Sequence, residues 1–431
     1  MNMSKVKDLS LSKKGELELE WARRNMPALS AIRTRFEKEK SLAGLTVSVA
    51  LHVEKKTGIL LETLAVGGAR VFASSCNPMT TDDTVAAALA KGGKIETFAW
   101  ANQTNDEYYF CLNSVLDAKP DIVIDDGCDL INLLHGKRKA ELPKIKGACE
   151  ETTTGITRLR AMHKAGKLLF PVLSVNDAYS KFLLDNQIGT AQSTLDAIAR
   201  ATNNLIAGKT VVIAGYGWCG RGIASRMKGM GANVIVVEIA GTLGPHESGM
   251  HRALSALYDG YRVMSMPSAA KEGDIFITAT GNKSVIDSAH FSLMKQGAIL
   301  CNSGHFNVEI NEPSLRKMSS KVEELKDNIV GYTLPNGKTL YLLSEGRLVN
   351  LARPSGQGHP IEIMDGSFAI QALCVEEIAK AKKGSLKAGV HDVPAEIDDA
   401  VAALLIEARG VRLEKPTKEQ LEYSESFEEG T

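Results

Sequence analysis

Lys181 and Asp185 lie four residues apart, a spacing that places an ammonium and a carboxylate on one face of a helix. Such a pair is by default an exposed ion pair, and this alternative stays open from the pair alone. Upstream, residues 150–154 set two carboxylates beside three hydroxyls. A helix cap explains one threonine but not the whole run, whose hydrogen-bonding capacity suits a polyol.

Three further polar residues, His52, Asn77 and Asp126, each follow a predicted β-strand. Strands and helices alternate over this part of the chain, which indicates a parallel, doubly wound sheet. Ligands bind beyond the carboxyl ends of the strands in such sheets. We therefore expect these three side chains to converge on one crevice.

Residues 209–238 read as strand, glycine turn, helix and strand, the pattern of a dinucleotide-binding unit. Gly215 permits the tight turn, Gly217 lets backbone approach a pyrophosphate, and Gly220 lets the helix pack closely. Glu238 ends the second strand, where a carboxylate accepts from a ribose diol and repels a 2′-phosphate. The unit predicts NAD rather than NADP; an ordinary glycine-rich turn is the alternative.

The composition narrows the class of protein. The 431 residues carry a formal net charge of +0, which argues against nucleic acid or an anionic membrane as partner. The sequence has no apolar run of membrane-spanning length and no signal-peptide pattern. Its seven cysteines are scattered without a C-x-x-C pair, which predicts reduced thiols in the cytoplasm, with neither a disulfide framework nor a metal site.

Several motifs occur in one order along the chain. They are LH at 51–52, DDG at 125–127, EETTTG from Glu150, VND at 175–177, GYGxxGxG from Gly215, CNxGHF from Cys301, EGRLVNL from Glu345 and GHP at 358–360. Together they resemble the S-adenosylhomocysteine hydrolase family, in its shorter archaeal and bacterial form, over nearly the whole chain. The resemblance implies two doubly wound α/β domains joined by hinges, with a small C-terminal tail. The expected bounds are 1–186 for a substrate domain, 187–350 for an NAD domain, 351–383 for a return to the substrate domain and 384–431 for the tail.

The family uses NAD as a built-in redox catalyst. Oxidation of the ribose 3′-hydroxyl acidifies the 4′ hydrogen, homocysteine leaves by β-elimination, water adds, and the ketone is reduced again. The resemblance implies that Lys181 and Asp185 handle the proton of the 3′-hydroxyl. A lysine can accept this proton if its pKa is lowered. It gives Asp126 the 4′ proton, and it places His52 and His305 near the leaving thiol and the attacking water.

The remaining expected site residues bind rather than react. For each histidine, taken alone, a structural role is the alternative. The expected substrate contacts are Glu54, Lys56, Asn77, Glu151, Thr152, Asn186 and His359. The expected cofactor contacts are Thr152, Thr153, Thr154, Asn186, Gly215, Gly217, Gly220, Glu238, Thr280, Asn302 and Asn350.

The purine is the least determined part of the substrate. Glu54 and Lys56 stand where the animal form has threonine and glutamate. Lysine only donates and suits the 6-oxo group of hypoxanthine, whereas Glu54 can accept from the 6-amino group of adenine. S-adenosyl-L-homocysteine is the first hypothesis and S-inosyl-L-homocysteine the alternative.

Two other functions stay open from the sequence, a plain NAD-dependent dehydrogenase and a non-enzymatic NAD-sensing paralogue. The second predicts loss of the proton-handling residues, and these are present. The family also implies a homotetramer. Residues 241–249 look like an insertion after Glu238, and the tail lacks the Lys/Tyr extension of the animal enzyme, from which we expect weaker retention of NAD.

Overall fold

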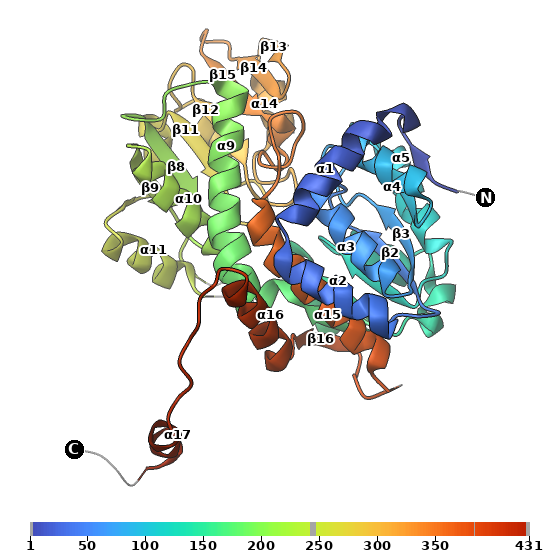
Figure 1. Ribbon diagram of the computed structural model, residues 1–431. Coiled ribbons are helices and arrows are strands. Elements are labelled where there is room, and N and C mark those ends of the chain that lie inside the picture. Colours follow the sequence, from blue (N-terminus) through green and yellow to red (C-terminus); the bar gives the residue numbers. More distant parts are fainter. Residues whose placement is uncertain (1–2, 242–246, 383, 428–431) are drawn as a thin grey trace.

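The computed structural model describes residues 3–241, 247–382 and 384–427, which form two α/β units side by side (Figure 1). Each unit contains one eight-stranded sheet with helices on both faces. The predicted fold class, two doubly wound domains, is thereby confirmed.

The first sheet has the order β1-β4-β3-β2-β5-β6-β7-β16, and every neighbouring pair is parallel. Its central strands are buried throughout, because helices cover both faces. The strand order reverses between β2 and β5, which is where a ligand crevice forms. The bounds are β1 (Lys5–Val6), β2 (Thr46–Ala50), β3 (Arg70–Ser74), β4 (Ile95–Ala99), β5 (Ile122–Asp125), β6 (Gly147–Glu150), β7 (Pro171–Ser174) and β16 (Gly389–Asp392).

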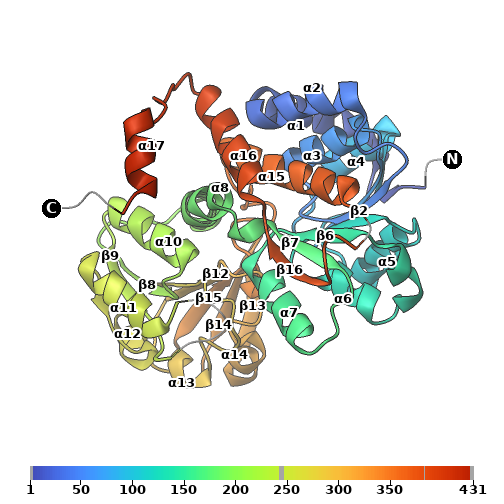
Figure 2. The same cartoon turned by 90° about the horizontal axis from the view of Figure 1, so that it is seen from below.

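Two sets of helices cover this sheet (Figure 2). One face packs on α1 (Ser12–Arg24), α2 (Pro27–Glu39), α3 (Lys55–Val66), α4 (Asp83–Gly92), α15 (Ile361–Lys380) and α16 (Ala395–Glu407). The other packs on α5 (Asn105–Leu116), α6 (Asp129–His135) and α7 (Thr153–Lys164). The first unit therefore needs both ends of the chain.

The amino-terminal segment forms two helices, α1 and α2, rather than one continuous helix. Pro27 is the first residue of α2, where the N–H that proline lacks would have no partner within the helix. The chain turns at Met26, just before it. The N–H groups of Ala28 and Leu29 donate to the carboxylate of Asp365 in α15 (2.9 and 2.8 Å). The carboxyl-terminal helix thus caps an amino-terminal one.

The second sheet has the order β10-β9-β8-β11-β12-β15-β14-β13, with antiparallel pairing only among the last three strands. Its order reverses between β8 and β11, at the glycine turn. Helices α9 (Thr190–Thr202), α10 (Trp218–Gly229) and α11 (Gly249–Tyr258) cover one face, and α12 (Met266–Glu272), α13 (Ser288–Phe291) and α14 (Glu312–Met318) the other. The strands are β8 (Thr210–Ala214), β9 (Asn233–Val237), β10 (Arg262–Val263), β11 (Ile275–Thr278), β12 (Ile299–Asn302), β13 (Lys321–Lys326), β14 (Ile329–Thr333) and β15 (Thr339–Leu343).

The chain crosses between the units twice. The outward crossing runs through α8 (Tyr179–Lys181), a π-helical segment (Phe182–Gly189) and α9, and the return runs through residues 344–360 into α15. The two crossings contain the expected domain bounds near residues 186 and 350. These bounds, and the role of the crossings as hinges, remain predictions. Residues 389–392, expected in the tail, form the edge strand of the first sheet.

The residues that follow α16 form a carboxyl-terminal arm, which extends away from both units and contains α17 (Lys418–Glu425) (Figures 1 and 2). None of the described side chains of α17 is buried. Within the described parts of the chain, we find no helix with the length and apolar character that a membrane crossing requires. Residues 242–246 of the expected insertion and the end of the tail lie outside the described residues.

Candidate active site

One cavity of about 640 Å³ is lined by both units and by both crossings. The strand-end loops that follow β2, β5 and β6 contribute its first wall, and the glycine turn and the loops that follow β11 and β12 contribute the opposite wall. All five predicted catalytic residues line it: His52, Asp126, Lys181, Asp185 and His305.

Lys181 lies at the centre of a buried cluster. Its Nζ donates to Oδ1 of Asn186 (2.8 Å) and lies 3.4 Å from Oδ1 of Asp185 and 3.5 Å from Oε1 of Glu151. Asp185 also pairs with Nδ1 of His359 (2.9 Å), from the return crossing. Lys181 and Asp185 are therefore not an exposed ion pair, and both are at least 96% buried.

The charges of this cluster differ from the expected ones. Burial acts to lower the pKa of Lys181, but Asp185 and Glu151 outweigh it and hold the pKa above its ordinary value. Burial acts to raise the pKa of Asp185, but Lys181 and His359 hold it below its usual range. Burial raises the pKa of Glu151 to about 8, although Lys181 opposes this. The lowered lysine pKa that a neutral base requires is thus not found, because two carboxylates face the ammonium.

Two residues of α15 support these carboxylates. Nε2 of Gln371 donates to Oε2 of Glu151 (2.5 Å), and Oγ of Ser367 donates to Oδ2 of Asp185 (2.8 Å). Both are fully buried and four residues apart, so they face the cluster from adjacent turns. The sequence reasoning missed them; the available signal was two polar residues at helical spacing in an apolar run.

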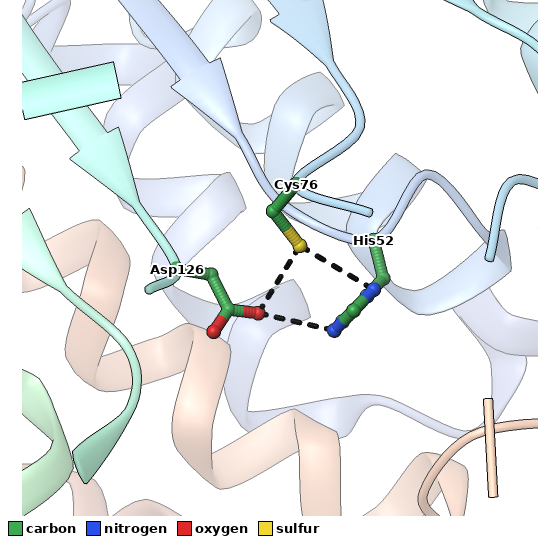
Figure 3. Close-up of side chains that lie close together, drawn as sticks. All are labelled: His52, Cys76 and Asp126. Carbon is green, nitrogen blue, oxygen red and sulfur yellow. Dashed lines mark hydrogen bonds and ion pairs between the residues drawn. The ribbon is translucent and has the colours of Figure 1, made fainter. Parts of the chain in front are cut away.

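The second cluster surrounds Asp126 (Figure 3). Its Oδ2 lies 3.2 Å from Nε2 of His52 and accepts from Sγ of Cys76 (3.4 Å), while its Oδ1 lies 3.5 Å from Nδ1 of His305. His305 comes from the second unit, and its Nε2 has no hydrogen-bond partner among the described residues. A Cβ at Gly127 would stand 2.4 Å from that nitrogen. The two units therefore meet closely here, and Cys76 is another residue that the sequence reasoning missed.

Two deeper carboxylates hold the loops that carry Asp126 and Glu151. Asp125 accepts from the N–H groups of Asp126 and Ile131, and Glu150 accepts from those of Gly127 and Thr152. Burial raises the pKa of Asp125 to about 7 and that of Glu150 well above its usual range. Since both groups bond backbone, they position the reactive residues.

Glu54 and Lys56 form a buried pair at the start of α3. Nζ of Lys56 donates to Oε2 of Glu54 (2.9 Å) and to the carbonyls of Gln357 (3.0 Å) and His359 (2.9 Å). All three ammonium hydrogens are thus engaged. From the residues that the structure describes, Oε1 of Glu54 accepts only two long contacts, both from Thr57 (3.3 and 3.5 Å), so it keeps capacity for a ligand donor.

Comparison with protein families decides what this geometry belongs to. The model described as S-adenosyl-L-homocysteine hydrolase matches residues 3–144, and the one described as its NAD binding domain matches residues 186–356. The chain belongs to the S-adenosyl-L-homocysteine hydrolase family. It is an enzyme, a hydrolase with NAD as its cofactor.

Curated relatives match from end to end. The S-inosyl-L-homocysteine hydrolase of Methanocaldococcus jannaschii is 53% identical and covers 100% of both chains. The adenosylhomocysteinase of Sulfurisphaera tokodaii is 51% identical over 99% of both. That of Thermococcus kodakarensis is 50% identical over 99% of this chain and 98% of its own. Members with two different printed activities are therefore similar to this chain to the same degree.

The NAD side of this hydrolase fits its cofactor. A Cβ at Gly217 would meet nothing within 4 Å, which leaves room for a pyrophosphate at the start of α10. A Cβ at Gly220 would stand 1.9 Å from the carbonyl oxygen of Gly215, so this glycine packs the helix against the turn. Oδ1 of Asn350 is buried and has no hydrogen-bond partner within the part of the chain that the structure describes, so it is an acceptor that a bound amide can satisfy.

Some expected contacts stand behind the cavity wall. The Asn302 side chain donates to the carbonyls of Gly304, Phe306 and Gly346 and accepts two bonds, so it shapes the loop that carries His305. Glu238 accepts from the N–H of Tyr216 (2.6 Å) and pairs with Arg252. The predicted site residues that line the cavity are His52, Glu54, Lys56, Asp126, Glu151, Thr152, Thr153, Thr154, Lys181, Asp185, Asn186, Gly217, Thr280, His305, Asn350 and His359. Outside the described lining lie Asn77, Gly215, Gly220, Glu238 and Asn302.

Proposed function

We propose that this enzyme hydrolyses S-adenosyl-L-homocysteine reversibly to adenosine and L-homocysteine. One observation carries the proposal: the Lys181 cluster, the Asp126 cluster and the open backbone at Gly217 all line a single cavity. Bound NAD would supply a reversible two-electron oxidation, which the family resemblance assigns to the ribose 3′ carbon.

In the proposed reaction the Lys181 cluster handles the 3′-hydroxyl. Because the ammonium stays charged, Lys181 donates a hydrogen bond to the 3′ oxygen and stabilises negative charge there. Glu151, with a pKa raised to about 8, is a better proton acceptor near neutral pH than Asp185, whose pKa is lowered. Thr152 and Asn186 line the same wall and bind the sugar.

The Asp126 cluster acts at the other end of the ribose. Asp126 takes the 4′ proton once the 3′ position is a ketone, and homocysteine leaves by β-elimination. Burial lowers the pKa of His52 to about 4, so the ring is neutral at pH 7 and can accept a proton from the water that adds. His305, across the cavity, orients Asp126.

A single assay tests the reaction type. The holoenzyme is incubated with S-adenosyl-L-homocysteine while free thiol and the absorbance of reduced nicotinamide are followed together. We expect stoichiometric thiol release without net accumulation of reduced nicotinamide. Accumulation of reduced nicotinamide without thiol would favour a plain dehydrogenase and contradict the proposal.

The purine has a second candidate, hypoxanthine. Adenine is favoured because all three hydrogens of the Lys56 ammonium are engaged, whereas Oε1 of Glu54 can still accept from a 6-amino group. The ammonium itself favours a 6-oxo group, and relatives such as that of Methanocaldococcus jannaschii carry the S-inosyl name. S-inosyl-L-homocysteine is therefore the alternative substrate.

The ratio of kcat/KM for adenosine and inosine in the synthetic direction decides between the purines. If Lys56 contacts the base, Lys56→Met lowers turnover of inosine about tenfold more than that of adenosine, the worth of one charge-assisted hydrogen bond. The matched control is Lys55→Met, whose ammonium pairs instead with Glu18 (2.6 Å). Equal losses for both nucleosides in Lys56→Met would show that this residue only anchors residues 357–359.

We further propose a cytoplasmic homotetramer in the S-adenosylmethionine cycle. All seven cysteines are unpaired, which suits a reducing compartment. Apolar side chains exposed on α11 (Met250, Leu254, Leu257) and on the arm (Leu421, Tyr423) support contacts between subunits. Light scattering of the purified holoenzyme gives the mass; a monomer would contradict the assembly.

A further inference from the structure

Glu309 is a buried carboxylate that has no part in the proposed reaction so far. It follows β12 and the loop of His305, and its exposed fraction is 1%. Its Oε2 accepts from the N–H and Oγ1 of Thr280 (2.9 and 2.7 Å), and its Oε1 accepts from the N–H of Gly281 (2.8 Å). Burial raises the pKa of Glu309, and these bonds oppose that effect. Because each of these partners is a donor, the group is an ionised carboxylate.

The carboxylate lies directly behind one part of the cavity wall. Thr280, Gly281 and Gly304 line the cavity, whereas Glu309 lies outside the described lining. A Cβ at Gly304 would stand 1.8 Å from Oε1 of Glu309, so the backbone of this glycine packs against the carboxylate. Within the described residues, no ammonium or guanidinium pairs with Glu309. Its negative charge is therefore neither paired nor screened by water, and it acts strongly across the wall.

The topology of the second sheet indicates which end of the cofactor this charge faces. The order β10-β9-β8-β11-β12-β15 is that of the dinucleotide-binding folds, whose ligand lies across the reversal between β8 and β11. The pyrophosphate belongs at the start of α10, and the adenosine ribose belongs at the end of β9. The nicotinamide half therefore falls on the other side, over the loops that follow β11 and β12. Glu309 joins these two loops.

We propose that Glu309 stabilises the oxidised, positively charged form of the bound nicotinamide over the reduced form. In the proposed function the ribose 3′ carbon gives a hydride to the nicotinamide ring, which thereby loses its positive charge, and the 3′-hydroxyl gives its proton to the Lys181 cluster. A fixed negative charge nearby favours the charged ring over the neutral one. The identity of the hydride donor rests on the proposed function, whereas the preference for oxidised cofactor concerns binding alone.

The test compares how tightly the full-length enzyme holds the two forms of the cofactor. Holoenzyme is equilibrated with mixtures of NAD⁺ and NADH and separated from free cofactor, and the absorbance of reduced nicotinamide gives the bound ratio. We expect Glu309→Gln to raise the bound ratio of NADH to NAD⁺ about tenfold, since a neighbouring charge shifts such equilibria by about one to three powers of ten. A weaker hold on the Thr280 loop affects both forms alike and leaves the ratio unchanged.

Two comparisons separate the charge from its structural contacts. Glu312→Gln removes a negative charge from the same stretch of chain, but that carboxylate pairs with Arg316 (2.7 Å) outside the described lining. The ratio should therefore stay at the wild-type value. Glu309→Asp and Glu309→Asn match in size and differ in charge, so only Glu309→Asn should raise the ratio. This second pair gives the answer if Glu309→Gln fails to fold.

Three results would overturn the proposal. They are an unchanged ratio in Glu309→Gln, equal ratios in Glu309→Asp and Glu309→Asn, or unfolding of both neutral variants while Glu309→Asp stays folded, which would assign the charge to folding alone. Thermal unfolding and total cofactor content identify the third case. If the ratio changes as expected while no thiol is released from S-adenosyl-L-homocysteine, Glu309 keeps this role and the proposed function fails.

Discussion

At the scale of single residues, the cavity depends on how opposite charges are shared around Lys181. Two carboxylates face one ammonium, and the pKa of one carboxylate falls while that of the other rises to about 8. A fixed ion pair and a titratable acid therefore lie within one cluster. The sequence predicted its members but not its charges, since Lys181 and Glu151 are thirty positions apart and their burial depends on the whole fold.

Gln371 is the residue that most directly adjusts Glu151. Its amide donates to the carboxylate and so lowers the pKa of Glu151 against the effect of burial. In Gln371→Leu that pKa rises further, and the acidic limb of the rate of cofactor reduction moves upward by about one pH unit, equivalent to roughly 1.4 kcal/mol. A pre-steady-state pH profile measures this shift.

Ser367→Ala serves as the comparison for Gln371→Leu. It removes the hydroxyl that donates to Asp185, a group whose pKa lies far below the assay range. We expect Ser367→Ala to lower the rate of cofactor reduction and to leave the acidic limb of its pH profile at the wild-type position. If Gln371→Leu only lowered the rate as well, Gln371 would be structural and would not tune the acid.

At the scale of elements, aspartates of the carboxyl-terminal helices cap the amino-terminal ends of helices that come earlier in the chain. Asp365 of α15 caps α2, and Asp398 of α16 accepts from the N–H groups of Tyr179 and Ser180 (2.6 and 2.9 Å) at the start of α8. Since α8 ends at Lys181, the cap by Asp398 positions the lysine at the centre of the buried cluster.

Asp398→Ala should both destabilise the enzyme and slow it. Loss of the cap leaves two backbone donors without a partner, and we expect the free energy of unfolding to fall by about 1–3 kcal/mol. The value of kcat should fall more than KM changes, because Lys181 is displaced rather than removed. Denaturant titration and steady-state kinetics measure the two effects.

The neighbouring Asp399 gives a matched control for that experiment. It is exposed on the same helix, so Asp399→Ala should change the free energy of unfolding by no more than about 0.5 kcal/mol and should leave kcat at the wild-type value. Unchanged kinetics in a destabilised Asp398→Ala would show that the cap does not position Lys181.

At the scale of the molecule, the alternation of strands and helices predicted both sheets, and the glycine unit predicted the cofactor. The contributions of α15 were not predictable in the same way, because Gln371 and Glu151 are 220 positions apart. Cys76 was missed for a related reason, since only the order of β2, β3 and β5 in the sheet brings it beside His52 and Asp126. Local sequence patterns therefore predict helices and strands, whereas contacts between residues far apart in the chain can be identified only once the fold is known.

The contact between Gly127 and His305 tests how closely the units must meet. Gly127 has φ +99°, and an added Cβ would lie 2.4 Å from the ring. Gly127→Ala should hold the units apart and lower kcat/KM by about 100-fold, the cost of misplacing reacting groups by about 1 Å. Small-angle scattering should give a larger radius of gyration than for the wild type. Full activity would mean that the ring moves aside at no cost.

The interleaved chain path has a consequence for synthesis on the ribosome. The second unit is complete in one continuous stretch, from α9 to β15, whereas the first sheet gains its edge strand β16 and two covering helices only from the last quarter of the chain. The first unit therefore cannot complete its fold until α15, β16 and α16 have been synthesised, and until then one apolar face of its sheet is partly uncovered. The second unit, although synthesised later, can fold before that point. A chain stalled before α15 should accordingly resist protease at residues 190–343 but be cut within residues 1–180.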